Sequence, residues 1–137
     1  YYMSKVKGSK AERELFHWLW KNFGPCIRSA GSGSTPKPCP DLIASNGKRA
    51  LAIECKSTKG DKVYLKCQEI ADLMEFSKSF GAEAWLGFRF DNRGWLFIEA
   101  SKVEKSQGKS YYMSFSLLKK NGYVLDELVG KYRQRRL

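Results

Sequence analysis

The sequence is poor in the residues that build zinc sites and membrane spans. It has one histidine, His17, and no pair of cysteines in Cys-x-x-Cys spacing, so a zinc site is not expected. The four cysteines are interpreted as small apolar residues. No apolar run approaches the roughly 20 residues that a membrane helix needs, and the N-terminus has no secretory pattern. We therefore expect a cytoplasmic protein without a membrane partner.

Acidic residues are also scarce relative to basic ones. The 137 residues include 25 Lys and Arg but only 14 Asp and Glu, which gives a net charge of +11. Up to Lys66, thirteen basic and five acidic residues leave +8, so most of the excess lies in the first half. This charge favours a polyanionic partner, nucleic acid before an anionic membrane, although a well-solvated basic surface is the alternative. The length and the 42% apolar content indicate a single domain over residues 1–137.

Apolar periodicity predicts the α/β class, with a mixed β-sheet flanked by helices. The main helices are expected over 9–22 and 66–80, and shorter ones over 115–120, capped by Ser114, and 126–132. Strands are expected over 26–30, 41–44, 49–56, 84–90 and 95–100, with 63–65 extending the sheet. Asn46-Gly47 predicts a type I′ hairpin turn, Gly81 ends the second helix, and the basic tail 131–137 is expected to be flexible.

Two carboxylates and a lysine interrupt two strands that otherwise read as core. Strand residues alternate between faces, so Glu54 and Lys56 share one face with small alanines. The Asn46-Gly47 turn brings the start of one strand beside the end of the other, which places Asp41 near Glu54. A hard divalent cation relieves the repulsion between two such carboxylates. The alternative for Glu54 and Lys56 alone is a surface salt bridge.

A third carboxylate lies on the first predicted helix. Glu12 shares a stripe at helical spacing with the apolar residues Leu15, Phe16, Leu19 and Phe23, and therefore points toward the sheet. A carboxylate aimed at a core is costly unless it is paired or bound to metal. The alternative is a capping box, in which Glu12 turns back to Ser9 at the start of the helix.

An arginine and a small-residue loop complete the candidate site. Arg28 lies between apolar neighbours in a predicted strand and is followed by a loop over 31–40 that contains Ser32. An arginine beside a carboxylate cluster suggests phosphate binding, and glycines let a backbone approach a phosphate closely. A plain linker is the alternative for the loop.

This pattern resembles the PD-(D/E)xK nuclease superfamily, in which Pro40-Asp41 is followed after 12 residues by Glu54-Cys55-Lys56. The stretches 7–15, 28–32, 40–56, 73–90 and 94–99 are similar, in order and spacing, to the archaeal Holliday junction resolvases, and the resemblance is strongest over 7–100. The longer connection over 33–39 is a departure from the shortest relatives.

The resemblance implies a restriction-endonuclease-like core and a homodimeric endonuclease that uses Mg²⁺, with Mn²⁺ substituting. Its substrate would be four-way junction DNA, nicked on two opposed strands, and not a small molecule. The residues that match the metal-site carboxylates are Glu12, Asp41 and Glu54, and the Cys55 backbone carbonyl can join them. Lys56 matches the catalytic lysine, and Arg13, Arg28 and Ser32 match the other active-site residues.

The basic residues near this motif are the candidate DNA contacts: Lys5, Lys7, Lys10, Arg13, Arg28, Lys59 and Lys62, together with Ser32. In the helix over 66–80, we expect Ile70, Leu73, Met74 and Phe80 to face inward, whereas a homodimer interface would use Met74, Phe76 and Phe80. Two other functions stay open. One is a restriction or repair endonuclease of the same superfamily, and the other is a junction-binding protein without catalysis.

Overall fold

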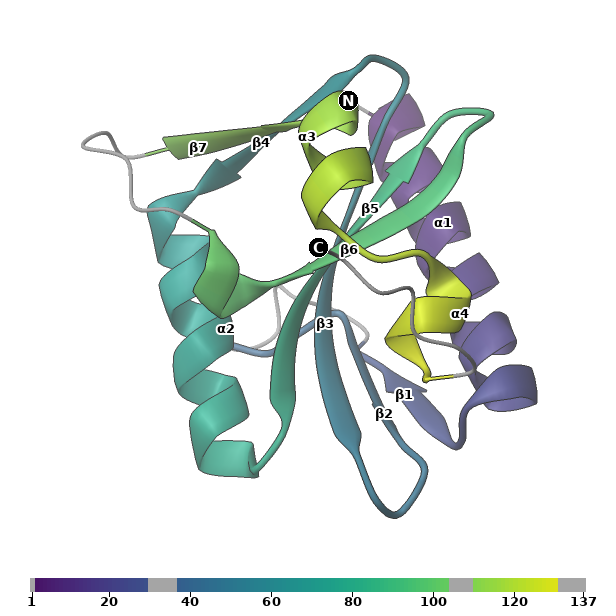
Figure 1. The fold of residues 1–137 in the computed structure, drawn as a ribbon, viewed down its shortest axis with the longest axis vertical. Helices are drawn as coiled ribbons and strands as arrows, with labels where there is room; N and C mark the ends of the chain where they lie inside the picture. The colour runs from purple at the N-terminus through teal and green to yellow at the C-terminus, as the bar shows by residue number, and fades with distance from the viewer. Residues whose placement is uncertain (1, 30–36, 104–109, 131–137) are drawn as a thin grey trace.

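The computed structural model describes residues 2–29, 37–103 and 110–130, with side chains from residue 8 onward within those ranges. The elements follow one another as α1 (Tyr2–Asn22), β1 (Cys26–Arg28), β2 (Leu42–Ser45), β3 (Ala50–Thr58), β4 (Lys62–Lys66), α2 (Cys67–Phe80), β5 (Glu83–Phe90), β6 (Gly94–Glu99), the 3-10 helix η1 (Ala100–Lys102), β7 (Ser110–Ser114), α3 (Phe115–Asn121) and α4 (Leu125–Leu128) (Figure 1).

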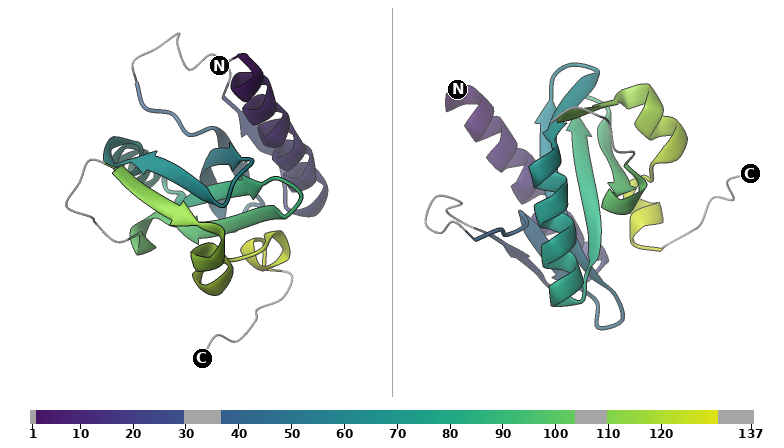
Figure 2. Two further views of the ribbon diagram at one scale, coloured as in Figure 1. Left: turned by 90° about the horizontal axis from the view of Figure 1, so that it is seen from above. Right: turned by 90° about the vertical axis from the view of Figure 1, so that its left-hand side faces the viewer.

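Five strands form the central sheet, in the order β1-β2-β3-β5-β6. Only the pair β3 and β5 is parallel, and α2 lies in the crossover between them. The other neighbours are antiparallel, so the predicted mixed sheet is confirmed. Figure 1 shows α1 and α2 on either side of the strands. Figure 2 shows α3 and α4 on the side of the molecule away from α1 when it is seen from above.

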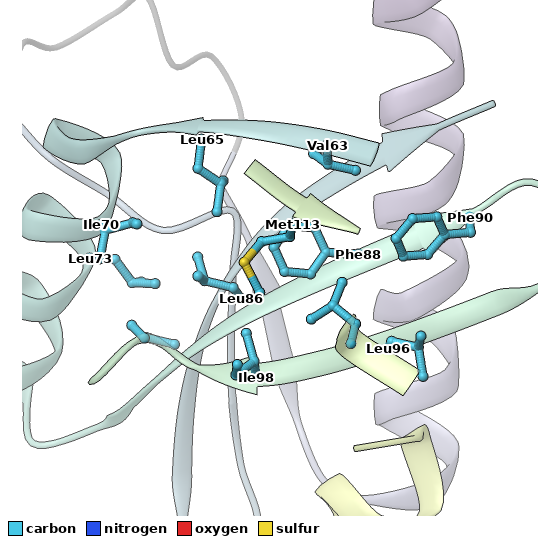
Figure 3. Close-up of a cluster of buried hydrophobic side chains, with 13 residues drawn as sticks. Val63, Leu65, Ile70, Leu73, Leu86, Phe88, Phe90, Leu96, Ile98 and Met113 are labelled. Carbon is cyan, nitrogen blue, oxygen red and sulfur yellow. The ribbon is translucent and has the colours of Figure 1, made fainter. Parts of the chain in front are cut away.

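The core consists of two apolar clusters, and the alternation of strand residues assigns side chains to them. On β5, Trp85 joins the cluster that contains Leu15 and Leu19 of α1. Its neighbour Leu86 joins the cluster of α2 and the β4–β7 pair, which Figure 3 shows in close-up. Gly87 must be glycine, because a Cβ atom there would lie 2.7 Å from the ring of Phe97.

The expected start of α1 is wrong. The helix begins at Tyr2, so Ser9 lies inside it and cannot be its N-cap. A single interior glycine such as Gly8 costs a helix only about 1 kcal/mol, which the flanking turns can offset. The capping-box alternative for Glu12 is therefore excluded.

The hairpin turn also differs from the expected type I′, which requires positive φ at both central residues. Gly47 has φ of 87°, but Asn46 is not among the described residues with positive φ. The last strand pair is Ser45 with Ala50, so four residues form the loop. Its geometry is held by Asn46 Oδ1, which accepts hydrogen bonds from the backbone N–H groups of Lys48 (2.9 Å) and Arg49 (2.8 Å).

Residues 63–65 do not extend the central sheet. They lie in β4, which pairs with β7 in a separate two-stranded sheet. We call this pair the β4–β7 ribbon. Local sequence could not reveal this, because the partner strand comes from the last third of the chain.

The faces of α2 agree with expectation only in part. Ile70 and Leu73 are buried, as predicted, and Gly81 ends the helix with φ of 85°. Met74 and Phe80 are instead exposed, at 42% and 58%, because the small Ser77 occupies the inward position after Leu73.

The C-terminal elements are close to those predicted. Ser114 caps α3, with its Oγ accepting from the Leu117 N–H at 3.1 Å. The last helix ends earlier than expected, at Leu128, and the tail 131–137 lies outside the described residues. In the part of the chain that the structure describes, no helix is long and apolar enough to cross a membrane.

Candidate active site

Asp41 and Glu54 meet where β2 begins. The register pairs Leu42 with Ile53, so the preceding Asp41 lies beside Glu54, as the sequence predicts. The Cys55 N–H donates a hydrogen bond of 2.8 Å to Asp41 Oδ2. The N–H and C=O of one strand residue point to the same edge, so the Cys55 carbonyl also lies on the side of Asp41.

The carboxyl group of Glu54 is strongly perturbed. Burial, and then the hydrogen bond and charge of Asp41, raise the pKa of Glu54 to about 10, against a smaller opposing effect of Lys56. At neutral pH, the protein without a bound cation therefore keeps a proton on Glu54, held between the two carboxyl groups. Whether a divalent cation takes the place of that proton stays a prediction.

The Cys55 side chain has a different role from its backbone. Burial raises the pKa of the Cys55 thiol well above its usual range, so the thiol stays protonated. A protonated thiol is a poor metal ligand. The backbone carbonyl is the group that Cys55 would offer to a cation, and that role stays a prediction.

Glu12 and Arg28 form the second part of the site. Glu12 on α1 lies near Asp41, and burial, followed by the Asp41 charge, raises the pKa of Glu12 against the opposing effect of Arg28. Arg28 Nη2 lies 3.6 Å from Glu12 Oε2 and donates to Ser9 Oγ at 2.6 Å. Arg28 Nε is buried and has no hydrogen-bond partner among the described residues. A buried donor without a partner suits an anionic ligand such as a phosphate oxygen.

Lys56 is held by a residue that sequence reasoning missed. Its Nζ forms an ion pair of 2.6 Å with Glu69 Oε2, in the first turn of α2. The other carboxylate oxygen, Glu69 Oε1, accepts from the Lys66 N–H at 3.3 Å. Because Lys66 is not Ser or Thr, the sequence carries no capping-box signature that would have pointed to Glu69. Its reach to Lys56 depends on the packing of α2 against β3.

The other predicted site residues lie on the surface or outside the described part of the structure. Arg13 is exposed and its Nη1 donates to Ser9 Oγ at 3.2 Å. The side chains of Lys10, Lys59 and Lys62 are exposed, as DNA contacts must be. Ser32 and the side chains of Lys5 and Lys7 lie outside the described part of the structure, so their predicted roles stay predictions.

The donor set suits a hard cation held by few protein groups. Asp41, Glu54 and the Cys55 carbonyl supply oxygen atoms, which Mg²⁺ prefers, with waters completing its shell. In the described ranges, no three His, Cys, Asp or Glu side chains are arranged as a complete metal site. The metal roles of Asp41, Glu54 and the Cys55 carbonyl therefore stay predictions. A metal role for Glu12 stays a prediction.

A comparison with known protein families shows which family this chain belongs to. The family described as archaeal Holliday junction resolvase (Hjc) matches residues 3–137 of this chain. The chain belongs to that family. The match to the Hjc family extends through the C-terminal third, beyond the range 7–100 over which the sequence motifs were strongest.

Individual Hjc relatives support the assignment. Crossover junction endodeoxyribonuclease Hjc of Archaeoglobus fulgidus is 38% identical over 132 residues, which cover 96% of each chain. The enzyme of the same name from Methanocaldococcus jannaschii is 34% identical over 131 residues, or 96% of this chain and 92% of the relative. The crystal structure of A. fulgidus Hjc superposes with a TM-score of 0.81 and 36% identity, covering 90% of this chain and all of that one. The restriction-endonuclease-like fold is thereby confirmed.

Proposed function

We propose that this chain is an endodeoxyribonuclease that resolves four-way DNA junctions by paired, Mg²⁺-dependent nicks, working in the cytoplasm on chromosomal DNA. The observation that carries the proposal is the pair Asp41 and Glu54, which lie in contact beside the Cys55 backbone. Two carboxyl groups this close are costly in a core, and a divalent cation between them would offset their repulsion. The names of the Hjc relatives supply the substrate class and the reaction.

The protein groups have separable tasks in phosphodiester hydrolysis. Asp41, Glu54 and the Cys55 carbonyl would hold Mg²⁺. A bound Mg²⁺ supplies a Lewis acid that offsets phosphate charge and lowers the pKa of water. Lys56, kept in place by Glu69, presents its ammonium group to the attacking water or to a phosphoryl oxygen. Arg28 donates from its buried Nε to the phosphate and offsets charge that develops there.

The test is a cleavage assay with labelled four-way junction, linear duplex and flap DNA, each incubated with Mg²⁺, Mn²⁺ or EDTA. We expect paired nicks in the junction with either cation, since Mn²⁺ accepts the same oxygen ligands, and none with EDTA. Binding of the junction without cutting would identify a non-catalytic junction-binding protein. Equal cutting of duplex would identify a different nuclease of the superfamily.

A homodimer is part of the proposal, because two opposed strands need two equivalent sites. Phe80 on α2 supports it, because its ring is exposed and stacks on that of Phe76 with ring centroids 5.2 Å apart. Met74 is also exposed, but at 3.6 residues per turn it lies on the other flank of the buried stripe of α2. The Phe76 and Phe80 pair is therefore the apolar surface of α2 that a partner subunit would cover. We expect Phe80→Glu to give a monomer in sedimentation analysis, while Lys78→Glu, a charge change on the same helix, leaves the dimer intact.

A further inference from the structure

The β4–β7 ribbon has one face that packs on the core and one that is exposed. Val63, Leu65 and Met113 point inward into the cluster that Figure 3 shows. The alternate residues point outward, and we call them the outward face of the ribbon: Lys62, Tyr64, Lys66, Ser110, Tyr112 and Ser114. They carry two positive charges and no negative charge. The core does not explain why this face holds two aromatic rings.

The two tyrosines lie side by side on this face. Tyr64 pairs directly with Tyr112 across the ribbon, and their ring centroids are 6.0 Å apart. The rings are largely open to solvent, since Tyr64 is 69% exposed and Tyr112 is 55% exposed. Lys62 Nζ lies 5.2 Å from the centroid of the Tyr112 ring. Exposed aromatic rings bordered by lysines are the elements of a surface that binds unpaired nucleotides.

One end of the ribbon adjoins the candidate active site. Lys66 is the last residue of β4, and its N–H donates to Glu69, whose other oxygen pairs with Lys56. A single carboxylate thus connects the ribbon backbone to the active-site ammonium. A DNA strand with a phosphate at Lys56 can therefore continue onto the outward face. The exposed Lys59, which precedes the ribbon in the chain, adds positive charge near its opposite end.

We propose that the outward face of the β4–β7 ribbon binds unstacked nucleotides at the branch point of the junction. The tyrosine rings would contact bases that have left the helical stack, and Lys62 and Lys66 would contact the adjoining phosphates. A second copy of the same face is a poor occupant, because two positively charged faces repel each other. The inference rests on the proposed function, since it takes junction DNA as the ligand.

The first test replaces the aromatic rings and measures the Kd for junction DNA with EDTA present, so that no cutting takes place. Base stacking on one ring is worth roughly tenfold in affinity. We therefore expect the double variant Tyr64→Leu/Tyr112→Leu to bind the junction about tenfold or more weakly than wild type. The double variant Tyr64→Phe/Tyr112→Phe keeps the rings and should bind within about twofold of wild type. The loss of affinity in the leucine variant should be larger for junctions with extra unpaired nucleotides at the branch point than for fully paired junctions.

A second test changes the lysines of the outward face and leaves both tyrosine rings in place. We expect Lys62→Gln/Lys66→Gln to reduce the slope of log Kd against log salt by about 1.5, because each phosphate contact contributes roughly 0.7 to 0.9. Lys48→Gln is the matched control for charge, since it lies in the β2–β3 loop at the opposite end of the molecule (Figure 1). Lys48→Gln removes one positive charge far from the ribbon, so its Kd for junction DNA should stay within twofold of the wild-type value.

The outcomes separate this inference from the proposed function. The ribbon proposal alone would be overturned if wild-type protein binds junctions and both double variants, Tyr64→Leu/Tyr112→Leu and Lys62→Gln/Lys66→Gln, bind them equally well. The ribbon proposal would also be overturned if Tyr64→Leu/Tyr112→Leu is a monomer in sedimentation and its Kd per subunit for the junction is unchanged. That result would show that the outward face joins two copies of the chain. Wild-type protein that does not bind junctions at all would overturn the proposed function, and this inference with it.

Discussion

At the scale of single residues, the molecule places acidic side chains where they repel one another, and the proposed Mg²⁺ would offset that repulsion. Asp41 and Glu54 lie in contact, and Glu12 faces them from α1. Each of these groups would be destabilising in an ordinary core. Their arrangement follows from the strand register, and its consequences can be measured one residue at a time.

Asp41→Asn should reduce junction cutting by more than about a hundredfold, since loss of even an indirect partner of a metal ligand costs 10- to 100-fold. Junction affinity should be unchanged or improved, because the variant removes a negative charge that repels phosphate. The measurement is single-turnover cleavage and Kd, with Asp72→Asn on α2 as the control for charge. Cutting by Asp41→Asn at nearly the wild-type rate with Mg²⁺ would contradict the site.

Binding of Mg²⁺ should release protons from the protein at neutral pH. Without a cation, the pKa of Glu54 is raised to about 10, so the carboxyl group is protonated at pH 7 and must lose its proton to become a ligand. The affinity for Mg²⁺ should therefore rise with pH up to about 10. Calorimetric titration in two buffers of different ionisation enthalpy should report close to one proton released at pH 7. Glu54→Gln should release none, and a wild-type value of zero would refute the assignment.

Glu69→Gln should lower the rate of cutting roughly tenfold while junction affinity changes little, because the variant frees the Lys56 ammonium from its carboxylate partner. The amide oxygen of glutamine can still accept from the Lys66 N–H, so the start of α2 is preserved. A double-mutant cycle distinguishes positioning from a general structural role. Glu69→Gln should have no further effect in a Lys56→Ala background, and an additive loss would argue against coupling.

At the scale of elements, one arginine adds polar contacts between the short C-terminal helix, whose Leu128 is buried in the core, and the sheet. Arg49, in the loop just before β3, forms two hydrogen bonds with Glu83 on β5, of 2.8 and 2.9 Å. Its Nη1 donates to the Leu128 carbonyl at the end of α4, also at 2.8 Å. These contacts connect three elements that are far apart in the sequence.

Arg49→Met should lower the free energy of unfolding by about 1 to 2 kcal/mol, a range reduced for the partial exposure of both side chains. The hydrogen bond from Arg49 lowers the pKa of Glu83, so this stabilisation is present above the usual carboxyl pKa and is lost as pH falls below it. Urea unfolding should show a larger difference from wild type at pH 7 than at pH 3, where the hydrogen bond from Arg49 to the Leu128 carbonyl still contributes. Lys48→Met is the control, and a difference of equal size at the two pH values would exclude the ion pair as its cause.

At the scale of the whole molecule, the net charge of +11 dominates long-range behaviour. Junction binding should depend steeply on salt, with several phosphate contacts per subunit each adding about 0.7 to 0.9 to the slope of log Kd against log salt. Selectivity for junction over duplex should persist, because it would depend on the spacing of two basic faces in the proposed dimer. Titrations against junctions and duplexes of several sequences at two salt concentrations test this. A flat salt dependence, or one duplex sequence that binds as well as a junction, would contradict it.

Much of the candidate site was predictable because it is built from contacts local in sequence. Asp41 and Glu54 are separated by one hairpin, and alternation along β3 places Glu54 and Lys56 on one face. The hairpin also sets the Cys55 N–H against Asp41. Helical periodicity likewise turned Glu12 toward the sheet, although the start of its helix was misplaced. Such arguments need only the strand and helix repeats, which the backbone imposes.

Tertiary structure alone decided the features that join distant segments. The pairing of Tyr64 with Tyr112 joins strands from different thirds of the chain, so residues 63–65 could not be assigned to their own ribbon from sequence. The ion pair of Lys56 with Glu69 depends on how the α2 crossover packs on β3. Local sequence determines which face a side chain takes, because the repeat of each element is fixed. Which other element packs against that face is determined by the packing of the whole chain, because the hydrophobic effect is non-directional and does not select a particular partner.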